Sequence, residues 1–255
     1  MTLLELTDLT RTFGSVAAVD GVSTAIDEGE IRGLIGPNGA GKTTLVNLLS
    51  GFLAPTRGSI RLGSEEIGRE PAHARVRHGI GRTFQTPQLC PRMSTLDNIV
   101  IGAHQRLAAA RFANLLSKKR RATLSQLRGE AAAIGETVGL GHLLHVPAGA
   151  LSYGHMRLAE IARALISKPR LFLLDEPVAG MNESESAAVA EIVRALPQDG
   201  TTVLVIEHDM PFVMGLCDRI SVLDYGVLIA EGTPDEIQRN PQVEEVYLGT
   251  LGEAE

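Results

Sequence analysis

The sequence GPNGAGKT at residues 36–43 constrains the fold more than any other part of the chain. It has the spacing G-x-x-x-x-G-K-T, which is typical of a loop whose backbone N–H groups bind phosphate. A short apolar run from Ile31 to Ile35 precedes the loop, and an amphipathic pattern that ends near Gly51 follows it. A strand, a glycine-rich turn and a helix in this order are the context that the motif requires. The sequence therefore predicts a phosphate-binding loop between a strand and a helix.

Each residue type in this loop has a chemical reason to be there. Gly36, Gly39 and Gly41 let backbone N–H groups converge on phosphate at a helix N-terminus, where the helix dipole favours anions. Lys42 is expected to reach the β- and γ-phosphates, and Thr43 to bind Mg²⁺. The alternative is a glycine turn that only caps a helix.

A second candidate site lies in LFLLDEP at residues 171–177, where four apolar residues end in two acids. Adjacent carboxylates at the end of a buried strand are costly unless they have a cation or a water to act on. Asp175 is predicted to bind Mg²⁺ directly or through water, and Glu176 to be the general base for the attacking water. The alternative is an exposed strand end with solvated acids.

The remaining hydrophobic pattern predicts an α/β fold with a helical insertion. Between Pro87 and about Arg163 the periodicity is helical and alanine is frequent, which predicts a helical subdomain. Elsewhere apolar strands alternate with helices, which is typical of a parallel sheet covered on both faces. The expected strands are residues 3–13, 16–26, 31–35, 58–63, 79–85, 171–177, 201–208 and two within 219–232, and the further helices are 184–196 and 210–217.

The composition is that of a folded globular protein, with 44% hydrophobic and 21% charged residues among 255. The net charge of −6 argues against a general nucleic-acid-binding protein, because such proteins carry an excess or a concentrated face of basic residues. Cys90 and Cys217 are far apart in the sequence, which predicts buried thiols in a reducing cytosol, with a disulfide as the alternative.

The N-terminal stretch MTLLELTDLTRTFG lacks the basic start and long apolar run of a signal peptide. The sequence also has no run of about 18 apolar residues that would span a bilayer. We therefore expect a cytosolic protein unless something else holds it at a membrane. The basic run SKKRR at 117–121 is expected to be a solvated face, with a contact to phospholipid headgroups as the alternative.

Five motifs, GPNGAGKT, RTFQ, LSYGHM, LFLLDEP and VIEHD, occur in this order and resemble the ATP-binding subunits of ABC transporters. In that family they are the Walker A, Q-loop, signature, Walker B and H-loop motifs. The resemblance covers most of the chain and implies one ABC ATPase domain at 1–255. Its implied fold is a RecA-like P-loop NTPase core with a mixed, largely parallel sheet and an antiparallel β subdomain, formed by 1–86 and 164–255, with a helical signature subdomain at 87–163.

The resemblance also implies roles for single residues. The ring of Phe13 would stack on adenine, Gln85 would contact Mg²⁺ or the attacking water, and His208 would face the γ-phosphate and Glu176. Gln85 would also adjoin the groove that receives the membrane subunits. The residues that would bind ATP are Phe13, Gly36, Pro37, Asn38, Gly39, Ala40, Gly41, Lys42, Thr43 and Thr44, and those that would hold Mg²⁺ are Thr43, Gln85 and Asp175.

The signature turn has little chemistry of its own, and the resemblance implies why. In the family it opens a helix whose N-terminus points at the γ-phosphate held by a second subunit, so that two ATP molecules lie between two domains. The residues concerned here are Leu151, Ser152, Tyr153, Gly154 and His155. The family usually has glutamine at the position of His155, and many relatives have aspartate at the D-loop position of Asn182.

The stretches GIGRTFQ, NIVIGAHQ, LDEPVAGMN and 206–249 resemble the larger ATPase subunit of branched-chain (hydrophobic) amino acid importers, and importers of urea or short amides are an alternative. The resemblance implies ATP and Mg²⁺ as cofactors and a peripheral place at the cytoplasmic face of the inner (plasma) membrane. The implied partners are transmembrane permease subunits, a second ABC ATPase subunit that is identical or related, and indirectly a solute-binding protein, with no nucleic acid.

Two other classes of function remain as alternatives. An ABC ATPase that acts on DNA or ribosomes would usually carry a long coiled-coil insertion, tandem ATP domains or cysteine-rich zinc modules. An unrelated GTPase would carry an N-K-x-D motif, and neither a GTPase nor a kinase explains LSYG at 151–154.

Overall fold

Three five-residue strands, β3 (Ile31–Ile35), β7 (Leu171–Asp175) and β8 (Thr202–Ile206), are buried along their whole length. Parallel strands that are covered on both faces have sequences that are almost continuously apolar, as the sequences of these strands are. They form the centre of a six-stranded sheet with the order β10-β9-β3-β8-β7-β6. Only β9 and β10 pair antiparallel in this sheet, whose other strands are β6 (Ile80–Arg82), β9 (Arg219–Asp224) and β10 (Val227–Gly232). The mixed, largely parallel sheet predicted from the sequence is confirmed.

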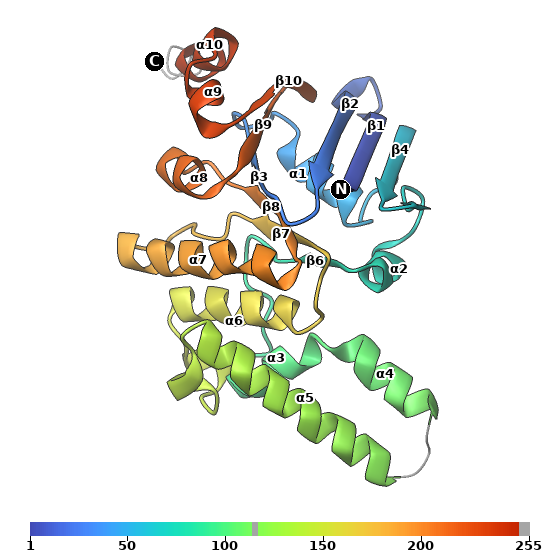
Figure 1. Ribbon diagram of the computed structural model, residues 1–255, viewed down its shortest axis with the longest axis vertical. Helices are drawn as coiled ribbons and strands as arrows, with labels where there is room; N and C mark the ends of the chain where they lie inside the picture. Colours follow the sequence, from blue (N-terminus) through green and yellow to red (C-terminus); the bar gives the residue numbers. More distant parts are fainter. Residues whose placement is uncertain (114–116, 250–255) are drawn as a thin grey trace. The chain divides into compact units, whose positions relative to one another are not determined.

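The computed structural model describes residues 1–113 and 117–249, with the backbone alone for 109–113, 117–120 and 248–249. The chain forms two compact units (Figure 1). Unit 1 comprises Met1–Arg82, Arg170–Glu176 and the chain from Val193 onward, and unit 2 comprises Thr83–Pro169 and Pro177–Ile192. The functional division at 1–86, 87–163 and 164–255 stays a prediction.

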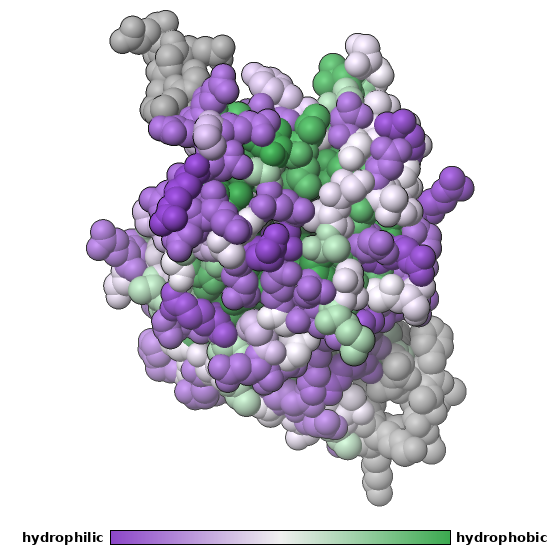
Figure 2. Space-filling view, turned by 45° about the horizontal axis from the view of Figure 1, so that its top comes forward, coloured by the Kyte–Doolittle hydropathy of each residue, from purple (hydrophilic) through white to green (hydrophobic). Residues whose placement is uncertain are grey.

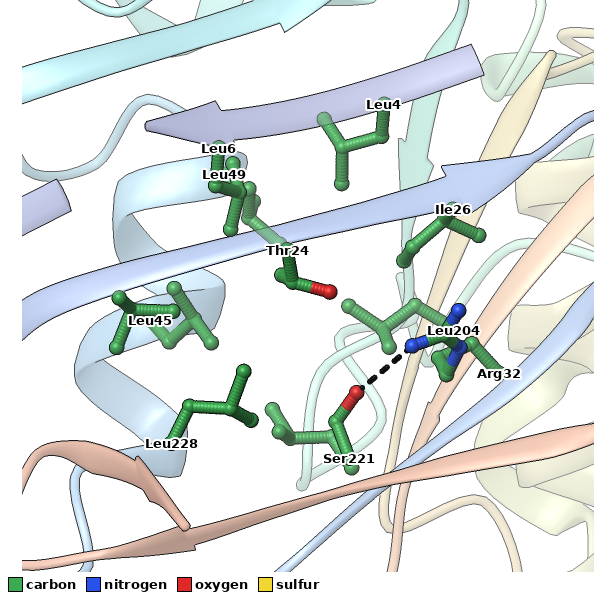
Figure 3. A pocket seen from close by; sticks show the side chains of 12 residues that line it. Leu4, Leu6, Thr24, Ile26, Arg32, Leu45, Leu49, Leu204, Ser221 and Leu228 are labelled. Atoms are coloured by element: carbon green, nitrogen blue, oxygen red, sulfur yellow. Dashed lines mark hydrogen bonds between the residues drawn. The ribbon is translucent and has the colours of Figure 1, made fainter. Parts of the chain in front are cut away.

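A second, antiparallel sheet belongs to unit 1 and has the order β2-β1-β4-β5. Its strands are β1 (Thr2–Phe13), β2 (Val16–Asp27), β4 (Arg57–Leu62) and β5 (Glu65–Glu66). Apolar residues of this sheet share one core with helix α1 (Lys42–Leu49) and with the central strands. A small cavity of ≈ 20 Å³ lies among the residues of this core. Figure 3 shows the side chains that line it, most of them leucine, and the hydrogen bond that Arg32 donates to Ser221. The volume of the cavity suits about one water molecule and no larger ligand.

Unit 2 is built from helices around its own apolar core, which includes Ile99, Leu127, Leu140 and Ala162. Close helix packing in this core depends on Gly102, where a Cβ would lie 1.8 Å from the carbonyl oxygen of Arg163. The helices of the two units are α2 (Ala72–Arg75), α3 (Thr95–Ile101), α4 (His104–Ala113), α5 (Ser117–Thr137), α6 (Tyr153–Leu165), α7 (Glu183–Ala195), α8 (Met210–Leu216), α9 (Pro234–Gln238) and α10 (Pro241–Gly249). Short 3₁₀ turns lie at Val76–His78, Gly141–Leu143, Ala148–Ala150 and Leu196–Asp199.

Several expected strands end earlier than their sequences suggest. The strand expected at 79–85 ends at Arg82, because the backbone groups that follow are bonded to side chains of α6. The strand expected at 171–177 ends at Asp175, since Glu176 has a left-handed backbone with φ of 47°. None of the helices within residues 1–113 and 117–249 is both long and apolar enough to cross a membrane.

The prediction that both cysteines are buried is wrong for Cys90, which is exposed. Its backbone fixes the loop instead, because the Cys90 N–H donates to Oδ1 of Asn98 at 2.7 Å and its carbonyl accepts from Nδ2 of Asn98 at 3.1 Å. Cys217 is buried, and burial raises the pKa of its thiol to about 12. Of the side chains in the basic run 117–121, those of 117–120 lie outside the described residues.

Candidate nucleotide-binding site

The glycines of the 36–43 loop have backbone conformations that the close packing around them requires. Gly36 has a φ of 149°, and a Cβ there would lie 2.1 Å from the carbonyl oxygen of Leu223. Gly41 has a φ of 99°, and a Cβ there would lie 2.2 Å from the carbonyl oxygen of Ala18. Gly41 is also the N-cap of α1 and makes no side-chain cap hydrogen bond. Because no capping side chain accepts from them, the first N–H groups of α1 can bind an anion.

The side chain of Lys42 turns back into the loop from which it comes. Its Nζ donates to the carbonyl oxygens of Gly36 at 2.7 Å and of Pro37 at 2.9 Å. Burial lowers the pKa of Lys42, and the negative charge of Glu176 opposes that shift. A positive charge thus lies within the loop and within electrostatic reach of the predicted base.

Asp175 is held in place at the carboxyl end of β7 by Arg82 of β6. Nη2 of Arg82 donates to Oδ2 of Asp175 at 3.0 Å, and Nη1 donates to Oδ1 of Asn47 at 2.7 Å and to Oγ of Ser50 at 2.8 Å. One guanidinium therefore links the predicted metal ligand to α1. Sequence reasoning missed Arg82, which lies inside the expected strand 79–85.

Glu176 and His208 come together at the ends of neighbouring parallel strands. The N–H of Glu176 donates to the carbonyl oxygen of Ile206 at 2.9 Å, which fixes the turn after β7. Oε1 of Glu176 then lies 3.8 Å from Nδ1 of His208, whose side chain is 68% exposed. Glu207, which the sequence reasoning did not single out, is buried and accepts the N–H of His208 at 3.1 Å. A carboxylate suited to a base and an accessible imidazole thus share one edge of the sheet.

Phe13 lies at the end of β1 and is 46% exposed. The guanidinium of Arg11 stands over its ring at 4.7 Å from the centroid, and Val16 is its partner across the hairpin. Figure 2 shows a face that is mainly hydrophilic, with hydrophobic residues gathered in small groups. An aromatic face accessible at a strand end can stack on a nucleotide base.

The signature turn forms the beginning of α6 in unit 2. Ser152 is the N-cap, and its Oγ accepts the N–H of His155 at 3.3 Å and lies 2.9 Å from Nδ1 of the His155 ring. The ring of His142 packs edge-on against that of His155 at 6.2 Å between centroids. Gly154 is buried, and a Cβ there would lie 2.5 Å from Oε1 of Glu185.

Asn182 and Glu185 cap the N-terminus of α7 reciprocally. Oδ1 of Asn182 accepts the N–H of Glu185 at 3.0 Å, and Oε2 of Glu185 accepts the N–H of Asn182 at 3.0 Å. This arrangement favours asparagine over aspartate at position 182, because an aspartate would place a second carboxylate beside that of Glu185.

Comparison with known proteins decides the family. The sequence model described as ABC transporter matches residues 19–179. The chain belongs to the ABC transporter family. A second model, described as branched-chain amino acid ATP-binding cassette transporter, matches residues 227–252. The family resemblance that we saw in the five motifs is thus confirmed, and so is the expectation of an ATPase.

Relatives of this ABC protein match it almost end to end. It is 41% identical to the high-affinity branched-chain amino acid transport ATP-binding protein BraF of Pseudomonas aeruginosa, over 97% of this chain and 98% of the relative. It is 40% identical to the protein LivG of Escherichia coli, described in the same words, over the same shares of the two chains.

Solved structures of ABC transporter cassettes have the same fold. A nucleotide-free ATP-binding cassette has a TM-score of 0.83 and 32% identity, with 97% of this chain and 99% of the other covered. An ADP conformation of an ATP-binding cassette has a TM-score of 0.84 and 33% identity, with 98% and 99% covered. The predicted fold class is confirmed, and the cassette binds nucleotide and hydrolyses ATP.

The predicted site residues of this cassette fall in both units. The phosphate loop, Asp175, Glu176 and His208 lie in unit 1, whereas Gln85, the signature turn and Asn182 lie in unit 2. Within residues 1–113 and 117–249, no three acidic, histidine or cysteine side chains form a metal-binding group. The hydroxyl of Thr43 and the carboxylate of Asp175 nevertheless fit Mg²⁺, because this ion takes a few protein oxygens together with water and nucleotide phosphates.

Proposed function

We propose that this ABC cassette hydrolyses ATP to energise the import of branched-chain amino acids through membrane subunits. The proposal rests on the nearly full-length likeness to BraF and LivG, whose names state that transport role. The match of the C-terminal segment 227–252 to a model described for the same transporters supports it independently. We also propose that the protein works as a peripheral subunit at the cytoplasmic face of the membrane.

ATP binding would use the loop in its present form. Phosphate oxygens would replace the carbonyls of Gly36 and Pro37 as the partners of Lys42, and backbone N–H groups of residues 38–44 would bind the same phosphates. Phe13 would stack on the adenine. Thr43, Asp175 and Gln85 would hold Mg²⁺, which supplies charge neutralisation at the phosphates when bound.

Hydrolysis would depend on the pair formed by Glu176 and His208. The carboxylate of Glu176 would accept a proton from the attacking water, while the imidazole, 3.8 Å from that carboxylate, would contribute a hydrogen bond toward the γ-phosphate. Arg82 would keep Asp175 oriented throughout, because its bonds to α1 do not involve the nucleotide.

Complete sites would form only when two cassettes meet. The hydroxyl of Ser152, the N–H of Gly154 and the N-terminus of α6 would then act on the γ-phosphate held by the second cassette. That cassette is either a second copy or a related subunit, and Asn182 would lie at the same contact. Permease subunits would contact the groove beside Gln85, and a solute-binding protein would act through those subunits.

The test is solute uptake by cells in which the gene carries Glu176→Gln. We expect uptake of radiolabelled leucine, isoleucine and valine to fall to background at unchanged protein abundance, while a Glu245→Gln variant, altered at an exposed glutamate of α10, transports normally. Normal leucine uptake in the Glu176→Gln cells would refute the proposed solute. Loss of urea or acetamide uptake instead would assign the cassette to that group of importers.

A further inference from the structure

One side of α6 carries four polar side chains that all contact the main chain of residues 84–88. Tyr153, Arg157, Glu160 and Arg163 are spaced by three or four residues, which places them on neighbouring turns of one helix face. The segment that they contact follows β6 and includes Gln85. Residues 83–90 have no regular secondary structure, so their backbone polar groups need other partners.

The contacts run along the whole segment. Nη1 of Arg157 donates to the carbonyl oxygen of Phe84 at 2.7 Å, and the hydroxyl of Tyr153 donates to that of Gln85 at 3.5 Å. Nη1 of Arg163 donates to the carbonyl oxygen of Gln88. Oε1 of Glu160 accepts the N–H groups of Phe84 at 3.4 Å and of Gln88 at 3.5 Å.

Two of these side chains, those of Arg157 and Glu160, are charged and yet deeply buried. Arg157 is 2% exposed and Glu160 is 1% exposed. Burial raises the pKa of Glu160, while Nη2 of Arg163 at 3.2 Å and the two N–H groups favour its ionised form. The guanidinium of Arg157 also stands 5.4 Å from the centroid of the Tyr153 ring.

Stability alone does not account for this arrangement. Within the described residues, Nη2 of Arg157 and Oε2 of Glu160 are buried without a hydrogen-bond partner. A buried polar atom without a partner costs about 1–3 kcal/mol, and an apolar helix face would avoid that cost. What the charged face does provide is a defined position for the main chain on either side of Gln85.

We propose that Arg157 and Glu160 are positioning residues for Gln85, and that α6 thereby joins the signature turn at its N-terminus to the Q-loop at its side. Because both contacts belong to one 13-residue helix, a shift of the signature turn on a nucleotide displaces the Q-loop main chain as well. This inference rests on the proposed roles of Gln85 and of the signature turn in ATP hydrolysis.

The test combines steady-state ATPase kinetics with amide hydrogen exchange on the full chain. Arg157→Gln and Glu160→Gln each remove charge and keep a side chain of polar character. We expect kcat to fall by about tenfold to a hundredfold, the loss that a misplacement of about 1 Å produces, with KM for ATP within about twofold because the phosphate loop is untouched. Exchange of the peptide covering residues 83–90 should become faster in both variants.

Glu130→Gln is the matched control, because it breaks a Glu–Arg pair of unit 2 that does not touch residues 84–88. Nη1 of Arg106 donates to Oε2 of Glu130 at 2.5 Å, and this hydrogen bond holds the pKa of Glu130 at about 2. We expect the control to leave kcat and the exchange of 83–90 unchanged. If Arg157→Gln fails to fold, Arg157→Lys keeps one donor and should give an intermediate kcat.

Two results would overturn the inference: faster exchange at 83–90 with wild-type kcat, or a lower kcat with unchanged exchange. Failure of the proposed function gives a different pattern. In that case the wild-type chain hydrolyses no more ATP than its Glu176→Gln variant, whatever residues 157 and 160 are.

Discussion

A methyl group at position 154 is predicted to separate the signature turn from the cap of α7. In Gly154→Ala, the new Cβ would lie 2.5 Å from Oε1 and 2.9 Å from Cδ of Glu185. Both distances are shorter than non-bonded atoms tolerate, so the carboxylate has to move. It then loses its hydrogen bond from the N–H of Asn182, which is 3.0 Å in length.

The size of the effect follows from the groups that are lost and gained. A hydrogen bond to a carboxylate contributes about 1.5–3 kcal/mol, and the lower figure applies because Glu185 is partly exposed. Replacing glycine by alanine in the first turn of α6 returns about 0.5 kcal/mol of backbone entropy. We therefore expect Gly154→Ala to lower the free energy of unfolding by about 1 kcal/mol.

Urea unfolding of a double-mutant cycle measures this contact. Glu185→Ser removes the carboxylate and keeps a residue that helix termini accept. In that background Gly154→Ala should cost nothing or stabilise slightly, which gives a coupling of about 1–1.5 kcal/mol between the two positions. Equal costs of Gly154→Ala in both backgrounds would refute the reasoning, because they would mean that the side chains do not meet.

Three further predictions concern turnover and the cap. Glu176→Gln should bind ATP, hydrolyse it very slowly and accumulate as a closed dimer in size-exclusion chromatography with ATP; near-normal turnover would rule out Glu176 as the base. His155→Ala should lower ATPase activity, because the ring, whose Nδ1 lies 2.9 Å from Oγ of Ser152, helps to hold the signature turn. Unchanged ATPase activity in this variant would remove this idea. Asn182→Asp should destabilise the protein by up to about 1 kcal/mol at low salt through repulsion from Glu185, and less at high salt; a loss that does not depend on salt would argue against repulsion.

The sequence predicted best where chemistry and local conformation coincide. The phosphate loop was recognisable because its glycines, Lys42 and the flanking strand and helix are all consecutive. The acids at 175 and 176 stood out because an apolar strand leads directly into them.

The residues that support the site could not be found in this way, because their role depends on segments that are distant in sequence. In the sequence Arg82 is one residue within an expected strand, and only the pairing of β6 with β7 brings it to Asp175. From the sequence alone, Glu160 would be expected to be a solvated helix residue. Its burial against residues 84–88 is visible only in the folded unit. The exposure of Cys90 is likewise visible only in the folded chain, where Asn98 binds its backbone.

The most direct test of the account is ATP-driven leucine uptake by the purified transporter. Tagged protein would be isolated from gently solubilised membranes with whatever subunits accompany it, and reconstituted into vesicles that expose the cassette to ATP. We predict that two hydrophobic subunits and a second ATPase are recovered, and that leucine uptake requires ATP and is lost with Glu176→Gln. Recovery with ribosomal or DNA-repair proteins, or leucine uptake that does not require ATP, would contradict the account.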